Sequence, residues 1–129
     1  MKKENNILEQ LLTDDNDINE KELLDILSPF IKINNSNQDI IFLDSTLDFN
    51  LKSKLLLFLL GKKVSFLLGK AETDHIKAKD IIEETGIPKG SVLPNLKLLK
   101  DEKLVTSDSQ GYFITSYQIS KIKNRNILN

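Results

Sequence analysis

The sequence predicts an α+β protein that is mostly helical, and three observations support this fold class. Residues 76–115 contain two segments with helical apolar spacing, followed by an alternating segment around a polar turn. Residues 55–60 are uniformly apolar, which is typical of a helix covered on more than one side. Residues 1–50 add short helical patterns and a second hairpin pattern, which completes a helical chain with two small hairpins.

The composition is that of an ordinary globular protein. Of 129 residues, 40% are hydrophobic and 29% are charged, which differs from the composition of disordered chains. The absence of cysteine excludes disulfides and thiolate metal sites, and it favours an intracellular, cytoplasmic protein. The chain starts without the apolar core of a signal peptide. Its longest apolar run is six residues, whereas a membrane span needs about 20, so we expect no membrane partner.

The net charge of −1 conceals an asymmetry between the two halves of the chain. Residues 1–51 carry four lysines and eleven acidic residues, a net charge of −7. Residues 52–129 carry fourteen lysines and arginines and eight acidic residues, a net charge of +6. A basic second half favours a negatively charged partner. The alternative interpretation is that the two halves attract each other.

Residues 1–50 are expected to form an acidic helix–helix–hairpin segment. A first short helix is predicted by an apolar stripe at Ile7, Leu8, Leu11 and Leu12. A second helix begins near Asp17, which stands three residues before Glu20 as in a capping box, and it ends before Ser28-Pro29. Apolar residues 30–33 and 39–43 flank a polar stretch, which predicts a hairpin.

Residues 51–129 are expected to form the second domain, which follows a linker at 44–50. Its first helix, near 53–68, contains the run Leu55–Leu60. Such a run predicts a central helix that packs on its own domain on one side and on residues 1–50 on the other. A dimer interface is the alternative explanation. A last amphipathic helix is predicted at 117–128.

The segment from Ile76 to Thr115 predicts helix, turn, helix and hairpin. The first helix, starting at Ile76, ends at Gly86, and Ile87-Pro88 cannot continue it. The second opens near Gly90-Ser91 and buries Val92, Leu96 and Leu99 at i, i+4 and i+7. Pro94 is tolerated early in this helix because the first four backbone N–H groups have no intrahelical partner. Residues 104–115 alternate around a polar turn, which predicts the hairpin.

Residues 85–105, TGIPKGSVLPNLKLLKDEKLV, resemble the turn and recognition helix of winged helix-turn-helix transcriptional regulators, particularly those common in archaea. The small and apolar positions of that pattern are occupied by Gly86, Ile87, Val92, Leu96, Leu99 and Leu104. The resemblance covers roughly residues 52–125 and implies a winged-helix domain, double-stranded DNA binding, a role in transcription and a homodimer. Residues 1–50 would then be an extension, or a degenerate second winged helix.

The resemblance implies that exposed residues near the start of the second helix contact DNA. By helical phase these residues are Lys89, Ser91, Asn95 and Lys97. An asparagine can form two hydrogen bonds with adenine, and lysines neutralise phosphates. Further backbone contacts are expected from Lys77 and Lys79 before it, and from Lys121, Lys123 and Arg125 in the last helix. The alternative interpretation is that these cations form an ordinary solvated surface.

A second class of function is a protein–protein adaptor that keeps the winged-helix scaffold without binding DNA. The turn of the hairpin, residues 107–111, has no basic residue and one acidic residue, so it is not expected to hold a phosphate. Pro94 has no hydrogen-bond donor for a base. Leu93, Pro94 and Leu98 would form an apolar contact surface for a protein partner if they are exposed.

The sequence does not predict an enzyme, a metal site or a cofactor. His75 is the only histidine, and its place beside Asp74 indicates a helix end or a surface position. The cluster of Asp14, Asp15 and Asp17 lacks the glycine and the final glutamate of a calcium loop. Residues 61–71 lack the glycine spacing and the Ser/Thr of a phosphate-binding loop.

Overall fold

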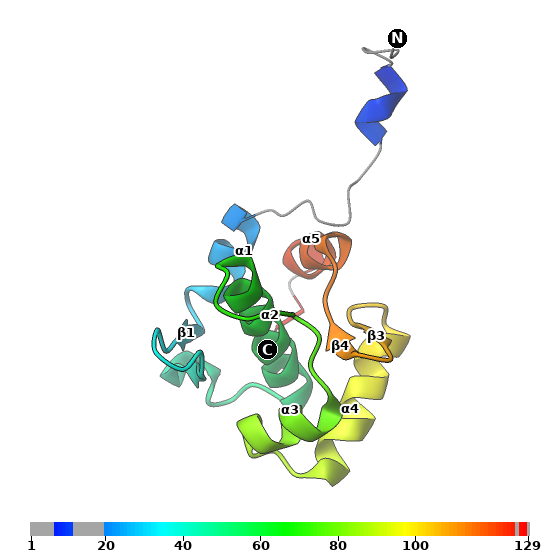
Figure 1. Cartoon of the computed structure of the whole chain (residues 1–129). Helices are drawn as coiled ribbons and strands as arrows, with labels where there is room; N and C mark the ends of the chain where they lie inside the picture. Colours follow the sequence, from blue (N-terminus) through cyan, green and yellow to red (C-terminus); the bar gives the residue numbers. More distant parts are fainter. Residues whose placement is uncertain (1–6, 12–19, 126, 129) are drawn as a thin grey trace.

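The computed structural model describes residues 7–11, 20–125 and 127–128 (Figure 1). In these ranges the protein is α+β and mostly helical, with two antiparallel two-stranded hairpins, as the sequence predicts. The elements are η1 (Ile7–Leu11), α1 (Glu20–Leu27), β1 (Ile31–Ile33), β2 (Ile40–Phe42), η2 (Asp44–Thr46), α2 (Leu51–Leu67), α3 (Ala78–Thr85), α4 (Lys89–Asp101), β3 (Thr106–Asp108), β4 (Gly111–Phe113) and α5 (Ser116–Arg125). Both η elements are short 3₁₀ helices.

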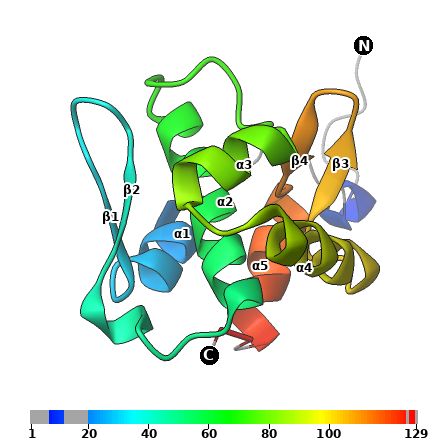
Figure 2. The same ribbon diagram turned by 90° about the horizontal axis from the view of Figure 1, so that it is seen from below.

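Helix α2 is the centre of the molecule. It begins at the N-cap Asn50, whose side chain accepts a hydrogen bond of 2.8 Å from the backbone N–H of Ser53. Elements α1, β1 and β2 pack on one side of α2, and α4 and β4 pack on the other (Figure 2). The six side chains from Leu55 to Leu60 are at most 2% exposed. The predicted central helix is therefore confirmed, and this run offers no surface for a dimer.

The elements before α2 match the expected pattern only in part. Hairpin β1–β2 forms as predicted, with Ile31 opposite Phe42 and Ile33 opposite Ile40. The predicted first helix is the five-residue 3₁₀ helix η1, and α1 is the one α helix described before α2. The expected linker contains the 3₁₀ helix η2. Leu12 and the acidic cluster Asp14, Asp15 and Asp17 lie outside the described residues.

Helix α4 begins earlier than the sequence analysis expects, and the interpretation of Pro94 is therefore wrong. Pro88 is the N-cap, and its carbonyl accepts hydrogen bonds from the backbone N–H groups of Ser91 and Val92 at 2.8 and 2.9 Å. Helix α4 thus starts at Lys89, and Pro94 lies inside it. An amide hydrogen at position 94 would have bonded to the carbonyl of Gly90, four residues earlier, so this helix loses one hydrogen bond.

Hairpin β3–β4 is extended by a third segment of chain. Ile76 pairs with Tyr112: each backbone N–H donates to the other residue's carbonyl, at 2.9 and 2.7 Å. The expectation that Ile76 belongs to the following helix is wrong, because α3 starts only at Ala78. The non-local pairing with Tyr112 holds Ile76 in an extended conformation.

Helix α5 closes the fold against α1. Ile119 and Ile122 of α5 are buried in the same hydrophobic core as the leucines of α1 and α2. Ser120 Oγ donates a hydrogen bond of 2.7 Å to Glu22 Oε1 of α1. The segments 1–50 and 51–129 therefore share one core in the described residues, and the division of the chain into two domains stays a prediction.

Candidate nucleic-acid interface

Helices α3 and α4 and the hairpin β3–β4 lie on one side of the molecule (Figure 2). Helices α3 and α4 pack against each other, and Ile81 of α3 and Val92 and Leu96 of α4 belong to the hydrophobic core and have no exposed surface. Because these residues face inward, the helical phase turns Lys89, Leu93 and Lys97 toward solvent. The buried stripe predicted for α4 is therefore confirmed, and it determines which residues can meet a partner.

Three of the predicted lysines lie where α3 and α4 begin. Lys77 is the N-cap of α3, Lys79 is in its first turn, and Lys89 is the first residue of α4. All three side chains are exposed, and none forms an ion pair within the described part of the chain. The start of a helix also presents free N–H groups and a partial positive charge. These positions therefore carry positive charge that is available to an anionic partner.

The residues predicted to read bases are less accessible to DNA than these lysines. Asn95 is half-buried, and its Nδ2 donates a hydrogen bond of 2.8 Å to the carbonyl of Ser91. Reading adenine would require this amide to turn outward and give up that bond. Ser91 is itself half-buried. The first turn of α4 therefore offers lysine more readily than a base-specific donor.

Lys97 forms an ion pair on the surface of α4. Its Nζ lies 3.4 Å from Asp101 Oδ2, one helical turn further on, and both side chains are exposed. An exposed pair of this kind contributes only about 0.3–0.5 kcal/mol, so Lys97 can leave it for a phosphate at small cost. Lys97 therefore remains a candidate for a phosphate contact.

The structure separates the cations of α5 from the lysines at the start of α4. Lys121 Nζ donates to the carbonyls of Glu102 and Lys103, at 3.4 and 3.2 Å, just beyond the C-terminal end of α4. Thirteen residues of α4 place that end about 20 Å from Lys89. The predicted interface is therefore not one continuous cluster.

The environments of Lys121 and Lys123 also differ from that of a free surface lysine. Partial burial, together with the positive charges of Arg125 and Lys103, lowers the pKa of the Lys121 ammonium group. Lys123 Nζ lies 3.4 Å from Asp25 Oδ2 of α1. Lys121 and Lys123 thus have structural contacts within the chain, and Arg125 is the last residue of α5.

The turn of hairpin β3–β4 is held by a polar cluster that the sequence pattern does not indicate. The His75 ring stacks on Phe113, with 3.9 Å between ring centroids and 4° between ring planes. His75 Nδ1 lies 3.3 Å from Asp108 Oδ1 in the turn, and His75 Nε2 lies 3.6 Å from Asp74 Oδ1. Asp74 Oδ2 in turn accepts a hydrogen bond of 3.0 Å from the buried Lys63 Nζ. The hairpin is therefore anchored to α2, and its tip is acidic.

The middle of α4 presents an apolar surface. Leu93 is 38% exposed and Leu98 is 48% exposed, and Pro94 beside them is also exposed. These are the three residues that the sequence analysis assigns to a protein contact. Their exposure leaves the adaptor interpretation open.

The described residues contain no group of three or more histidine, aspartate or glutamate side chains placed to hold a metal ion. No helix in the described ranges combines the length and apolar content needed to cross a membrane. A cytoplasmic location stays a prediction. No protein-family model matches the chain, and neither the curated proteins nor the solved structures contain a match.

Proposed function

We propose that the protein binds double-stranded DNA through a winged helix-turn-helix built from α2, α3, α4 and the hairpin β3–β4, and that it regulates transcription. One observation carries the proposal: Lys77, Lys79 and Lys89 are exposed and unpaired, among the described residues, at the starts of α3 and α4 on one side of the molecule. A recognition helix that enters the major groove by its N-terminal end would bring such residues to phosphates.

The proposed binding is dominated by charge. The Asn95 amide is bonded within α4 and Pro94 offers no donor, so base reading contributes little. If three lysines each neutralise one phosphate, the logarithm of affinity falls with the logarithm of salt concentration with a slope of about −3. A steep salt dependence with modest sequence preference is therefore the expected behaviour.

The test is fluorescence anisotropy of a labelled mixed-sequence duplex, titrated with protein at several salt concentrations. The double variant Lys77→Glu/Lys89→Glu should lower affinity at least about tenfold, because two phosphate contacts become repulsive. The matched control is Lys32→Glu/Lys70→Glu, which makes the same charge change on the side of hairpin β1–β2, where Lys70 Nζ bonds to Asn35. Equal affinities for the two variants would show that the binding face does not include Lys77 and Lys89.

The second candidate is a protein–protein adaptor, which the exposed Leu93, Pro94 and Leu98 favour. It predicts a co-purifying protein partner and no salt-sensitive DNA binding. The variant Leu93→Ser/Leu98→Ser would then release the partner. If this variant instead leaves the co-purifying proteins unchanged, the apolar face of α4 is not the contact.

Homodimerisation, which the resemblance implies, stays a prediction. The buried run Leu55–Leu60 no longer supports it, so the minimal proposal is one chain on one DNA site. Light scattering of the purified protein at micromolar concentration measures the oligomeric state directly.

A further inference from the structure

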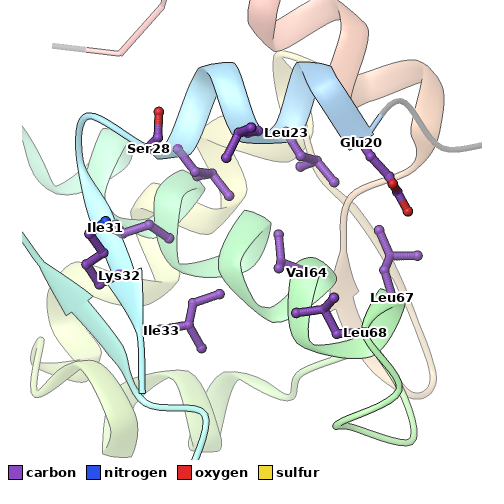
Figure 3. Close-up of a pocket in the computed structure, with 11 residues that line it drawn as sticks. Glu20, Leu23, Ser28, Ile31, Lys32, Ile33, Val64, Leu67 and Leu68 are labelled. Atoms are coloured by element: carbon purple, nitrogen blue, oxygen red, sulfur yellow. The ribbon is translucent and has the colours of Figure 1, made fainter. Parts of the chain in front are cut away.

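An apolar groove lies between α1, β1 and the C-terminal end of α2 (Figure 3). Its volume is about 450 Å³. The floor includes the buried Leu23, Leu27 and Ile31, whereas Leu24 and Leu68 on its rim are each 65% exposed. Lys32 and Glu20 add charge at the edge. The groove therefore leaves apolar surface in contact with water, which favours an apolar occupant.

The same chain carries a second exposed apolar surface, on the 3₁₀ helix η1. Helix η1 exposes Ile7 by 72%, Leu8 by 66% and Leu11 by 81%. Residues three apart eclipse each other in a 3₁₀ helix, so Leu8 and Leu11 lie above one another on one side. Glu9 lies between them in sequence and is exposed. One face of η1 is thus apolar and unburied.

The connection between the two surfaces is short. Residues 12–19 join η1 to α1, and Glu20, the first residue of α1, itself lines the groove. Eight residues span at most about 26–29 Å, which is enough to place η1 on the groove of its own chain. A short tether gives an effective concentration in the millimolar range, so the chain's own η1 is favoured over a second copy at micromolar protein.

The groove edge carries one charge of each sign, from Glu20 and Lys32, so Lys32 is the group that can face Glu9 of η1. Lys32 on the groove edge is exposed, and it forms no ion pair in the ranges that the structure describes. Glu9 of η1 has the opposite sign. A docked η1 can therefore bury its leucines in the groove while its carboxylate stays near the rim.

We propose that this groove is the docking site of the protein's own N-terminal segment, Ile7–Leu11. The docked segment covers the apolar rim formed by Leu24 and Leu68. The inference is independent of the proposed DNA binding, because the groove lies between α1, β1 and the end of α2, whereas the proposed DNA face is formed by α3 and α4.

The test uses a disulfide trap in the full chain. Because the sequence contains no cysteine, the variant Leu8→Cys/Leu68→Cys has only the two introduced thiols. The control Leu8→Cys/Leu47→Cys uses another exposed leucine, 73% exposed against 65% for Leu68, near the other end of α2. The length of α2, 17 residues, separates the two sites by about 25 Å. Both are oxidised in dilute solution and analysed by non-reducing gel and mass spectrometry.

Docking within one chain predicts a monomer with an internal disulfide. This disulfide should form at least about tenfold faster in Leu8→Cys/Leu68→Cys than in Leu8→Cys/Leu47→Cys. Equal rates in the two variants overturn the proposal. A covalent dimer as the main product also overturns it and assigns the groove to a second copy.

A dye measurement avoids dependence on disulfide geometry. The variant Leu8→Ser/Leu11→Ser keeps the full chain but removes the apolar face of η1, so it should free the groove and raise the fluorescence of a hydrophobic dye several-fold. Leu47→Ser is the control and should leave the fluorescence unchanged. Unchanged fluorescence in the first variant contradicts docking.

Discussion

Gly111 determines how closely hairpin β3–β4 approaches the chain before α3. Its φ of +130° lies outside the range that residues with side chains adopt readily. A Cβ atom at this position would lie 2.5 Å from the carbonyl carbon and oxygen of Ile76. The next residue, Tyr112, exchanges two backbone hydrogen bonds with Ile76. Glycine is therefore required for the third segment to pair with the hairpin.

We expect Gly111→Ala to lower the free energy of unfolding by about 3 kcal/mol or more, because backbone strain adds to a clash with backbone that cannot move aside. Gly86→Ala is the matched comparison, since Gly86 has φ of +73° and open space around its Cα. Gly86→Ala should lower the free energy of unfolding by only about 1 kcal/mol. Urea unfolding measures both, and equal losses would show that the contact with Ile76 is unimportant.

Gln110 lies at the tip of the same hairpin, which carries no positive charge. Its backbone N–H donates a hydrogen bond of 2.8 Å to Asp108 Oδ1, while its side chain is exposed. If the hairpin approaches DNA, Gln110→Lys should add one phosphate contact and steepen the salt dependence by about one unit of slope. Anisotropy titrations measure this change, with Gln110→Glu expected to act in the opposite direction. Identical slopes for both variants would exclude the hairpin from the interface.

At the scale of elements, α4 combines a well-packed inner face with a weakened backbone. Val92, Leu96 and Leu99 have no exposed surface, so packing holds the helix in place. Pro94 removes the hydrogen bond to the carbonyl of Gly90, and Gly90 is exposed, so water can satisfy that carbonyl. The apolar stripe therefore compensates for a residue that helices normally exclude from their interior.

We expect Pro94→Ala to raise the free energy of unfolding by about 1–3 kcal/mol, because it restores the hydrogen bond and removes the ring's contact with the Gly90 carbonyl. Lys97→Ala, at another exposed position of the same helix, should change it by less than about 0.5 kcal/mol. Urea unfolding compares the two. Destabilisation by Pro94→Ala would mean that the proline ring makes packing contacts worth more than the hydrogen bond.

At the scale of the whole molecule, the first and last α helices are joined by polar contacts as well as by the core. Asp25 Oδ2 of α1 lies 3.4 Å from Lys123 Nζ of α5 and 3.4 Å from Lys21 Nζ. Burial raises the pKa of Asp25, but hydrogen bonds and charges from Lys123 and Lys21 outweigh it, so the pKa falls below its ordinary value of 3.8. The charged form of Asp25 is therefore favoured in the folded protein.

A depressed carboxylate pKa stabilises the fold above the unfolded-state value and loses this effect as the pH falls through the folded-state value. Asp25→Asn should therefore be less stable than the parent protein by a constant amount at neutral pH. The difference should vanish as the pH falls below 3.8, the ordinary pKa of the group. Urea unfolding over a pH series measures it, and Lys123→Ala should remove part of the same difference, because Lys21 also lowers the pKa of Asp25. A difference that persists in acid would assign the effect to packing.

Local sequence patterns were sufficient for most of the elements. The apolar spacing of α4, the glycine that ends α3 at residue 86 and the polar turns of both hairpins each act over a few residues. The run Leu55–Leu60 likewise predicts a helix that is buried on all sides, and the structure confirms this burial. Such features are predictable because helical period, capping and turn conformation are properties of neighbouring residues.

The tertiary structure alone decided which distant residues meet. Ile76 pairs with Tyr112, and His75 lies against Asp108, 33 residues away, although nothing in the spacing of these residues indicates it. The fold likewise separates the lysines of α5 from those at the start of α4. The sequence by itself determined the local elements and their buried faces. Pairing between elements, and so the composition of the candidate interface, depends on the packing of the whole chain around α2, because no local pattern encodes a contact between distant segments.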